Sequence, residues 1–280
     1  LFPAGKEKGL MMASANTMTA QTEVQDSTVD NIVEVRNITK FYGEDIHALD
    51  SINLDFPAGQ MTTLLGPSGC GKTTLLKIIA GLLEPTNGQI FVDGREVTGP
   101  GPERAFVFQD FALLPWASVL RNVAFGLELT HHPKAEREDT ARHYIDKVGL
   151  SGFENKYPHE LSGGMRQRVG LARALAVNAD VLLMDEPFSA VDEQTRRKFQ
   201  EDLLHLLSVE KKTVIFVTHS IEEAVYVSDQ IVLLSPRPCR IHSQIRPAIS
   251  RDASPDDIRR DKAYLDTVEQ IWVDLKKYLD

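Results

Sequence analysis

The chain has 280 residues, 42% of them hydrophobic and 25% charged, which is typical of a globular protein with one large domain or two small ones. Its formal net charge of −9 at pH 7 argues against a protein that holds nucleic acid mainly by neutralising phosphates, so we expect no nucleic-acid partner. The sequence has neither a run of about 20 apolar residues nor the layout of a secretion signal, so we expect a cytosolic protein that can dock on a membrane protein.

The first 30 residues differ in composition from the rest of the chain. They are rich in Thr, Ser, Gln, Ala and Met without periodicity, which predicts a disordered leader over residues 1–30. Leu1 is not a natural start, and Met11 or Met12 is a candidate initiator.

Two strands are predicted next, over residues 32–35 and 48–56. In the second strand, Ile52, Leu54 and Phe56 alternate with polar residues. This alternation predicts an antiparallel sheet with one face in water.

The most informative segment is the loop at residues 66–73, which reads GPSGCGKT and fits the pattern G-x-x-x-x-G-K-S/T. It lies between a strand-like run at 61–65 and a helix-like run at 74–80, the context that a phosphate-binding loop requires. Glycines let backbone N–H groups turn toward phosphate oxygens, the helix N-terminus adds favourable partial charge, and Lys72 supplies a cation. Thr73 is predicted to bind Mg²⁺ through its hydroxyl. The predicted nucleotide-binding residues of this segment are Gly66, Pro67, Ser68, Gly69, Cys70, Gly71, Lys72, Thr73 and Thr74.

Cys70, inside this loop, has two interpretations. It is either a redox switch or, as we favour, a small residue tolerated at a variable position. Cys239 is the second cysteine of the chain. The pair fits a reducing compartment and forms no metal-ligand cluster.

The remaining pattern changes from strands to helices and back. Strands are predicted at 89–92 and 105–108, and helical patterns dominate from about 116 to 157. Short continuous apolar runs, separated by helix-like segments, follow at residues 181–184, 214–217 and 231–234. Such runs are typical of buried parallel strands in an α/β sheet.

Polar residues follow three of these strands directly, where α/β sheets keep their ligands. Asp185 is predicted to bind Mg²⁺, and Glu186 to polarise the water that attacks the γ-phosphate. His219 can donate a hydrogen bond to a terminal phosphate, and Gln109 can reach the metal or its water. In isolation the two carboxylates would read equally well as solvated loop acids, but the phosphate loop upstream favours the functional interpretation.

A second anion-binding helix start is predicted at residues 161–168, which read LSGGMRQR. Ser162, Gly163 and Gly164 open a helix, and backbone N–H groups at such an opening bind anions. If this segment cannot fold back onto the first loop, it must serve the nucleotide of a partner.

In this order the motifs resemble the nucleotide-binding subunit of ATP-binding cassette (ABC) transporters. The resemblance covers residues 31–241 and rests on the phosphate loop, Gln109, the signature at 161–165, the Asp185–Glu186 pair, the segment 189–192 and His219. It implies an α/β fold: a P-loop NTPase (RecA-like) core with an antiparallel β subdomain and an inserted α-helical subdomain at about 116–157. The implied domains are an ABC nucleotide-binding domain at 31–245 and a C-terminal helical extension at 246–280, where apolar spacing over 256–279 predicts one or two helices.

The resemblance also implies that two cassettes, identical or paralogous, meet head to tail, with each ATP between one phosphate loop and the other subunit's signature. Ser162 and Gly164, with Gly163 in the same signature, would contact the partner's γ-phosphate, and Asp192 would line the shared seam. Tyr42 matches the aromatic residue that stacks on adenine, although a strand-end packing role is the alternative. The implied cofactors are ATP and Mg²⁺.

Two positions depart from the family pattern. Met165 stands where many relatives have Gln, which puts side-chain contacts there in doubt but leaves the main-chain anion site. Val191 replaces Leu, a conservative apolar change.

A finer resemblance lies in residues 113–116 (LLPW), 217–224 (VTHSIEEA) and 234–238 (LSPRP). These segments look like the importer ATPases that energise uptake of nitrate, sulfonates, taurine and related small solutes. The implied partners are transmembrane permease subunits and, indirectly, an extracytoplasmic solute-binding protein, and the implied location is peripheral, on the cytoplasmic face of the plasma (inner) membrane.

Two other functions compete with transport. The first is a soluble cassette ATPase for cofactor or protein-machine assembly; the segment at 113–116 favours transport over it. The second is a DNA-maintenance ATPase, which is disfavoured because the segment between phosphate loop and signature is too short for a long coiled coil.

The apolar cluster after Gln109 suggests how ATP turnover is coupled to transport. Its members are Phe111, Leu113, Leu114, Pro115 and Trp116. We expect them to help form a groove for a cytoplasmic helix of the membrane subunit, with burial in the core as the alternative.

Overall fold

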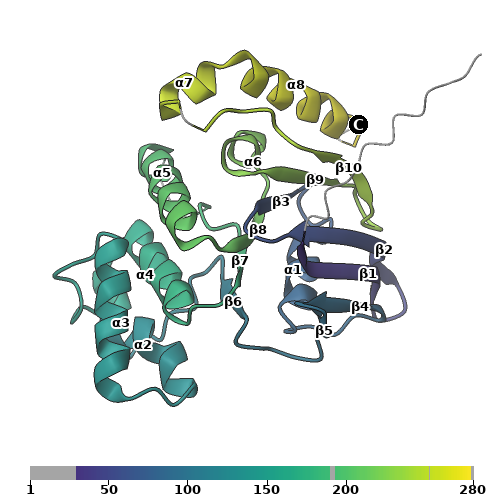
Figure 1. The fold of residues 1–280 in the computed structure, drawn as a ribbon. Coiled ribbons are helices and arrows are strands. Elements are labelled where there is room, and N and C mark those ends of the chain that lie inside the picture. Colours follow the sequence, from purple (N-terminus) through teal and green to yellow (C-terminus); the bar gives the residue numbers. More distant parts are fainter. Residues whose placement is uncertain (1–29, 190–192, 252, 279–280) are drawn as a thin grey trace, which may run out of the picture.

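The computed structural model describes residues 30–189, 193–251 and 253–278, which form two β-sheets and a set of surrounding helices (Figure 1). The predicted leader, apart from residue 30, lies outside the described residues. The strands are β1 (Asn31–Tyr42), β2 (Ile46–Pro57), β3 (Met61–Leu65), β4 (Asn87–Val92), β5 (Arg95–Glu96), β6 (Arg104–Val107), β7 (Val181–Asp185), β8 (Thr213–Thr218), β9 (Gln230–Leu234) and β10 (Ile241–Ile245). The helices are α1 (Lys72–Ile79), α2 (Val119–Leu129), α3 (Lys134–Lys147), a 3₁₀ turn (Pro158–Glu160), α4 (Gly163–Ala176), α5 (Glu193–Glu210), α6 (Ile221–Val227), α7 (Pro255–Arg260) and α8 (Lys262–Lys276).

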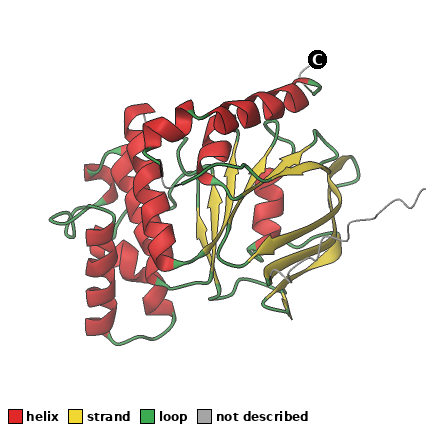
Figure 2. Cartoon of the chain, turned by 45° about the horizontal axis from the view of Figure 1, so that its top comes forward, coloured by secondary structure: helices red, strands yellow, loops and turns green. Residues whose placement is uncertain are grey.

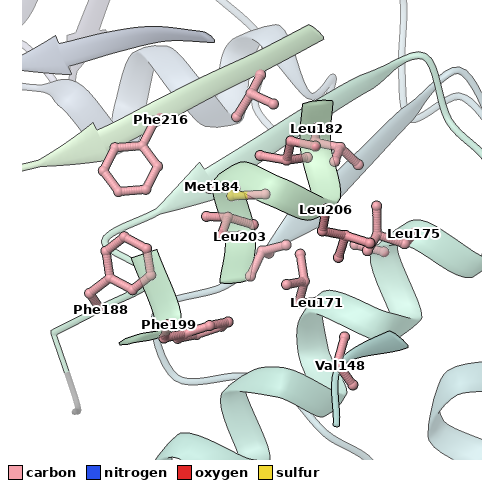
Figure 3. Close-up of a cluster of buried hydrophobic side chains, with 14 of the residues drawn as sticks. Val148, Leu171, Leu175, Leu182, Met184, Phe188, Phe199, Leu203, Leu206 and Phe216 are labelled. Atoms are coloured by element: carbon pink, nitrogen blue, oxygen red, sulfur yellow. The ribbon is translucent and has the colours of Figure 1, made fainter. Parts of the chain in front are cut away.

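The larger sheet has the strand order β10-β9-β3-β8-β7-β6, and all its pairs are parallel except β10 with β9. Alternate side chains of its central strands belong to two separate hydrophobic clusters. Leu182 and Phe216 lie in the first cluster, and Leu183 and Ile215 lie in the second. Figure 3 shows the first cluster, where the strands pack against α4 and α5. Because both faces of these strands are buried, they read in the sequence as continuous apolar runs, as predicted.

The smaller sheet is antiparallel, with the order β2-β1-β4-β5. In β2 the residues Ile52, Leu54 and Phe56 are buried, which confirms the predicted alternation. Strand β1 is longer than the predicted 32–35 and reaches Tyr42. Asn37 has a φ of 53° at an irregularity in the β1–β2 pairing, and this bulge breaks the alternation on which the sequence-based boundary depended.

Helix α1 and the inner face of the small sheet enclose the second hydrophobic cluster, whereas α2, α3 and α4 pack on one another at the other side of the large sheet (Figures 1 and 2). The predicted helical stretch at about 116–157 contains α2 and α3. A mostly parallel core, an antiparallel sheet and a helical layer together confirm the predicted fold class.

The C-terminal segment contains α7 and α8, and α8 lies across α6 (Figure 1). Tyr264 and Ile271 are buried, and the Tyr264 hydroxyl donates to the carbonyl of Glu222 (3.3 Å). The prediction of one or two helices is confirmed. Strand β10 was not predicted, because only its two end residues are apolar. It is held in the sheet by its backbone pairing with β9.

The described residues include no helix with the combination of length and low polarity that a bilayer-spanning segment needs.

The docking of α8 gives a stability prediction. Ile271 is fully buried, so Ile271→Ala should lower the free energy of unfolding by about 2–5 kcal/mol. Leu265, on the same helix, is 52% exposed, and Leu265→Ala should change it by less than about 0.5 kcal/mol. Urea unfolding of both variants measures the difference; equal effects would mean that α8 does not pack as described.

Candidate active site

The phosphate loop connects β3 to α1 with the backbone geometry that the motif predicts. Gly71 is the N-cap of α1 and has a φ of 129°, a conformation that L side chains rarely adopt. A Cβ at this position would lie 2.8 Å from Leu49 Cδ2, and a Cβ at Gly66 would lie 2.8 Å from the Leu234 carbonyl oxygen. The loop therefore needs glycine at both positions, and α1 presents its first N–H groups without a side-chain cap, as an anion site requires.

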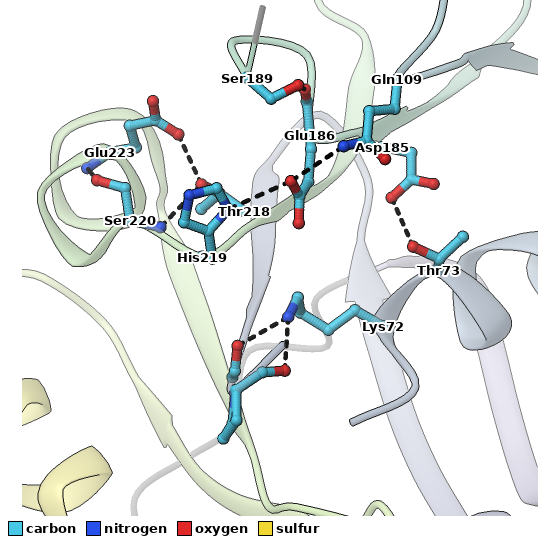
Figure 4. A network of polar contacts seen from close by, with 12 residues as sticks. Lys72, Thr73, Gln109, Asp185, Glu186, Ser189, Thr218, His219, Ser220 and Glu223 are labelled. Carbon is cyan, nitrogen blue, oxygen red and sulfur yellow. Dashed lines mark hydrogen bonds and ion pairs between the residues drawn. The ribbon is translucent and has the colours of Figure 1, made fainter. Parts of the chain in front are cut away.

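Lys72 is the first residue of α1 and is only 5% exposed. Its Nζ donates to the carbonyl oxygens of Gly66 (2.7 Å) and Pro67 (2.9 Å), as Figure 4 shows. The cation is thus held over the loop by two main-chain acceptors, in a position to bind phosphate oxygens.

A cavity of about 360 Å³ opens beside the loop. Tyr42 lines it from the end of β1, and its hydroxyl lies 3.3 Å from Thr74 Oγ1. Arg237 lines it too, and its Nε donates to the carbonyl of Gly69 (2.6 Å). The lining residues are Tyr42, Ile46, Ala48, Ser68, Gly69, Gly71, Lys72, Thr73, Thr74, Glu186 and Arg237.

Thr73 and Asp185 meet at the C-terminal end of β7. The Thr73 hydroxyl donates to Asp185 Oδ1 (2.9 Å), and burial raises the pKa of Asp185, which is 4% exposed. Two hard oxygen donors at this distance suit Mg²⁺. Within the described ranges, no three His, Cys, Asp or Glu side chains form a metal-binding group, so a magnesium ion here would need phosphate oxygens and water for its other positions.

Glu186 is the centre of a polar network (Figure 4). Its Oε2 accepts from Gln109 Nε2 (3.4 Å) and lies 3.2 Å from His219 Nδ1. Glu186 has a φ of 45°, a strained conformation for a side-chain-bearing residue, and its N–H donates to the Val217 carbonyl (3.0 Å). Three residues that follow three different strands are therefore brought together at one edge of the sheet.

The turn after β8 fixes His219. The Thr218 hydroxyl donates to Glu223 Oε2 (2.6 Å) and accepts from the Ser220 N–H (3.1 Å). Ser220 caps α6 by accepting from the Glu223 N–H (3.2 Å). These interlocking bonds hold the turn that carries His219.

The second helix start lies apart from this cavity. Ser162 is the N-cap of α4 and accepts from the Met165 N–H (3.3 Å), and Gly163 and Gly164 begin the helix. No residue of 161–165 lines the nucleotide cavity, as far as the described residues show. The predicted anion site at this helix start is therefore separate from the cavity beside the chain's own phosphate loop.

Comparison with known proteins agrees with this geometry. The model of the ABC transporter family matches residues 49–189. An uncharacterised ABC transporter ATP-binding protein of Methanocaldococcus jannaschii is 53% identical over 222 residues, covering 78% of this chain and 83% of that protein. The chain belongs to the ABC transporter family. It is therefore an ATP-binding and ATP-hydrolysing protein, as its motifs predict.

Other relatives of this ABC ATPase have more specific names. The taurine import ATP-binding protein TauB of Pseudomonas syringae is 46% identical over 245 residues, covering 86% of this chain and 94% of that protein. Among solved structures, the dimeric post-hydrolysis state of an ATP-binding cassette bound to ADP and Pi has a TM-score of 0.69 and 33% identity, and covers 76% of this chain and 98% of that one.

Sequence reasoning missed two arginines of the ABC ATPase. Arg237 enters the nucleotide cavity from the loop after β9, and no motif marked it as a site residue. Arg173, on α4, donates to the carbonyl oxygens of Phe111 (2.8 Å) and Ala112 (2.7 Å). Both acceptor residues have positive φ, 65° and 44°. Arg173 thus ties the signature helix to the segment that follows Gln109, a contact that no spacing in the sequence reveals.

The predicted apolar cluster divides between two environments. Leu113 packs against the larger hydrophobic cluster, whereas Trp116 is 71% exposed. Among the other predicted site residues, Asp192 lies outside the described residues.

Asp185 gives a prediction with opposite effects on stability and on metal binding. Asp185→Asn removes a buried charge but keeps an acceptor for Thr73, so the nucleotide-free protein should gain about 1–2 kcal/mol in its free energy of unfolding at neutral pH. The gain should vanish as the pH falls below the raised pKa of Asp185, because the wild-type carboxyl is then neutral as well.

Urea unfolding across pH, without nucleotide or Mg²⁺, measures this difference, and the exposed Asp110→Asn is the control. The same Asp185→Asn variant should bind ATP with a weakened dependence on Mg²⁺. A stability difference that does not change with pH would contradict the interpretation.

Proposed function

We propose that this ABC ATPase is the motor subunit of an importer that energises uptake of a small solute, such as taurine, another sulfonate or nitrate, through a partner permease. The observation that carries the proposal is the similarity to taurine import ATP-binding proteins of several bacteria, at 46–48% identity over about four fifths of the chain. The domains that we propose are the cassette at 31–245, with its helical subdomain at about 116–157, and the helical extension at 246–280.

The proposed hydrolysis uses the groups at the carboxyl edge of the large sheet. Lys72 and the amides of residues 69–74 hold the phosphates, and Tyr42 stacks on adenine. Thr73, Asp185 and Gln109 would hold Mg²⁺, and the ion would neutralise charge that develops on the phosphate oxygens. Glu186 accepts a proton from the attacking water and His219 donates a hydrogen bond to the γ-phosphate.

We propose that the complete site needs a second cassette. Ser162, Gly163 and Gly164 form an anion site that is separate from the chain's own nucleotide cavity, and they are partly exposed or exposed. A partner's γ-phosphate would satisfy this site, with Asp192 at the seam. The similarity to a dimeric cassette bound to ADP and Pi supports this arrangement.

Coupling to the permease is proposed to involve Trp116. An indole that is 71% exposed, seven residues after Gln109, offers apolar surface for a cytoplasmic helix of the membrane subunit. Arg173 connects the segment between Gln109 and Trp116 to the signature helix α4. A movement of Gln109 on ATP binding would therefore be transmitted to Trp116 and to α4.

The two tryptophans of the chain allow a matched test of the coupling proposal. Trp116→Glu should lower solute uptake by about tenfold or more while the ATPase activity of the purified protein is kept, because a buried carboxylate opposes docking. Trp272→Glu changes a comparably exposed tryptophan, 50% exposed on α8, and should leave uptake unchanged. Unchanged uptake in a well-folded Trp116→Glu variant would contradict the proposed docking site.

The partners are tested by purification from native membranes with Glu186→Gln and ATP present. A permease that co-purifies, and a solute that stimulates hydrolysis by the reconstituted wild-type complex, would support the importer function and identify the solute. Soluble partners alone would favour a cassette ATPase for assembly of a cofactor or a protein machine.

A further inference from the structure

The two cysteines of the chain lie against each other, although 168 residues separate them in the sequence. Cys70 belongs to the phosphate loop and is 2% exposed; Cys239 follows β9 and is fully buried. A Cβ built on Gly71, the residue after Cys70, would lie 3.5 Å from Cys239 Cβ, and both cysteines belong to the second hydrophobic cluster. The fold therefore brings the only two thiols of this protein together directly behind the nucleotide cavity.

The segment that carries Cys239 is a fixed support for the loop. The Cys239 N–H donates to the Ala48 carbonyl and its carbonyl accepts from the Asp50 N–H, both at 3.0 Å, which ties it to β2. Two residues earlier, Arg237 is bonded to the Gly69 carbonyl. A covalent bond between the cysteines would therefore join the glycine-rich loop to the segment that is hydrogen bonded to β2.

The local electrostatics make the two thiols unequal. The hydrogen bond from Cys239 and the charge of Lys72 lower the pKa of Cys70, although burial opposes them. The same contact and burial raise the pKa of Cys239. Because the thiolate is the reactive form, Cys70 is the nucleophile of the pair and Cys239 remains a thiol.

We propose that Cys70 and Cys239 form a reversible disulfide that weakens ATP binding when the cell is oxidised by hydrogen peroxide. The Cys70 thiolate attacks one oxygen of the peroxide, the O–O bond breaks and hydroxide leaves, which gives a sulfenic acid. The Cys239 sulfur then attacks the Cys70 sulfur; the S–O bond breaks, and the Cys239 proton leaves with the hydroxyl group as water. In total, two thiols and one peroxide give one disulfide and two waters, and a dithiol reductant reverses the reaction by exchange.

The effect on ATP follows from the position of Cys70 between two glycines. A disulfide needs an S–S distance of about 2.05 Å, shorter than the contact distance of two unbonded sulfurs, so its formation would draw the loop and Cys239 together. Gly69 and Gly71, on either side of Cys70, line the cavity and would move with the loop. A displacement of about 1 Å in such a site lowers function by up to about 10²-fold, so we expect ATP affinity to fall by about tenfold or more.

The test treats the reduced, full-length protein with hydrogen peroxide, digests it without reductant and identifies cross-linked peptides by mass spectrometry. Binding of a fluorescent ATP analogue is measured before and after treatment, and again after dithiothreitol. We expect a Cys70–Cys239 peptide pair, a loss of binding that dithiothreitol restores, and slower cross-linking when ATP and Mg²⁺ hold the loop in place.

Cys239→Ala is the control, because it removes the resolving thiol and lies outside the residues assigned to nucleotide binding. It should bind ATP like the reduced wild type, should not form the cross-link, and should not regain after dithiothreitol any binding that peroxide removes. Sulfinic or sulfonic acid on Cys70 without a cross-link, a disulfide between two chains, or a cross-link that leaves ATP binding unchanged would each overturn the proposal. None of these measurements depends on the importer role, because ATP binding is measured directly.

Discussion

Glu186→Gln should lower ATP turnover by at least about 10²-fold while ATP affinity stays close to that of the wild type. The Glu186 carboxylate contacts both Gln109 and His219, where it can accept a proton from a water, and a positioned base contributes about 10²–10⁴-fold. The amide of glutamine keeps the shape and can still contact both neighbours, but it cannot accept a proton. Single-turnover hydrolysis and equilibrium binding of ATP measure the two quantities separately.

A matched control for this prediction is Glu222→Gln. Glu222 lies three residues after His219 and is exposed in the first turn of α6, so it should tolerate the same substitution with turnover within about twofold, as for a surface change. If Glu186→Gln hydrolyses ATP at the wild-type rate, Glu186 is not the base. If it loses ATP binding, its role is in the structure of the site and not in the chemical step.

Lys72→Ala should have its main effect at the earlier step, ATP binding. Lys72 is buried with two carbonyl contacts, and in the complex its Nζ would contact phosphate oxygens. Hydrogen bonds to charged groups contribute about 1.5–3 kcal/mol each, so the loss of such contacts should weaken ATP binding by about 10²-fold or more. Calorimetric titration with a non-hydrolysable ATP analogue and Mg²⁺ measures this loss.

The control for Lys72 is Lys198→Ala, which removes an exposed ammonium group from α5 and should leave affinity unchanged. Unfolding must be measured in parallel, since Lys72 also satisfies two carbonyl oxygens of the nucleotide-free loop. A Lys72→Ala protein that is folded and binds ATP normally would exclude Lys72 from phosphate binding.

The sequence predicted those parts of the site that depend on local geometry. A glycine-rich turn, a helix start and a polar residue at the end of a strand are each specified within a few residues, so the sequence alone proposed the loop at 66–73, Asp185, Glu186 and His219 as site residues. Their meeting at one edge followed from the rule that parallel strands end together, and the contacts of Glu186 with Gln109 and His219 agree with it.

The parts that escaped prediction depend on tertiary contacts. Arg173 and Arg237 donate hydrogen bonds to main-chain carbonyls of segments that are distant in the sequence. Every residue has such a carbonyl, so no pattern in the sequence marks which one accepts. Strand β10 is held by an edge of the sheet and not by its own hydrophobicity. For Cys239 only the residue type was evident in the sequence; its position near Cys70 comes from the pairing of its segment with β2.

The two-residue period of β7 also divides the work of its final carboxylates. Odd-numbered residues of this strand, Val181 and Leu183, face the cluster that contains α1, and even-numbered Leu182 and Met184 face the other. Asp185 continues the odd series and reaches Thr73 on α1, whereas Glu186 turns away to His219. Two adjacent acids are thus directed to different neighbours, Asp185 by the pleat of β7 and Glu186 by its left-handed backbone conformation. Deletion of a single residue within β7 would move each later side chain of the strand to the opposite face of the sheet. The two hydrophobic faces would be exchanged, and Asp185 would no longer point toward Thr73. The length of this strand is therefore as important as the identity of the acids that end it.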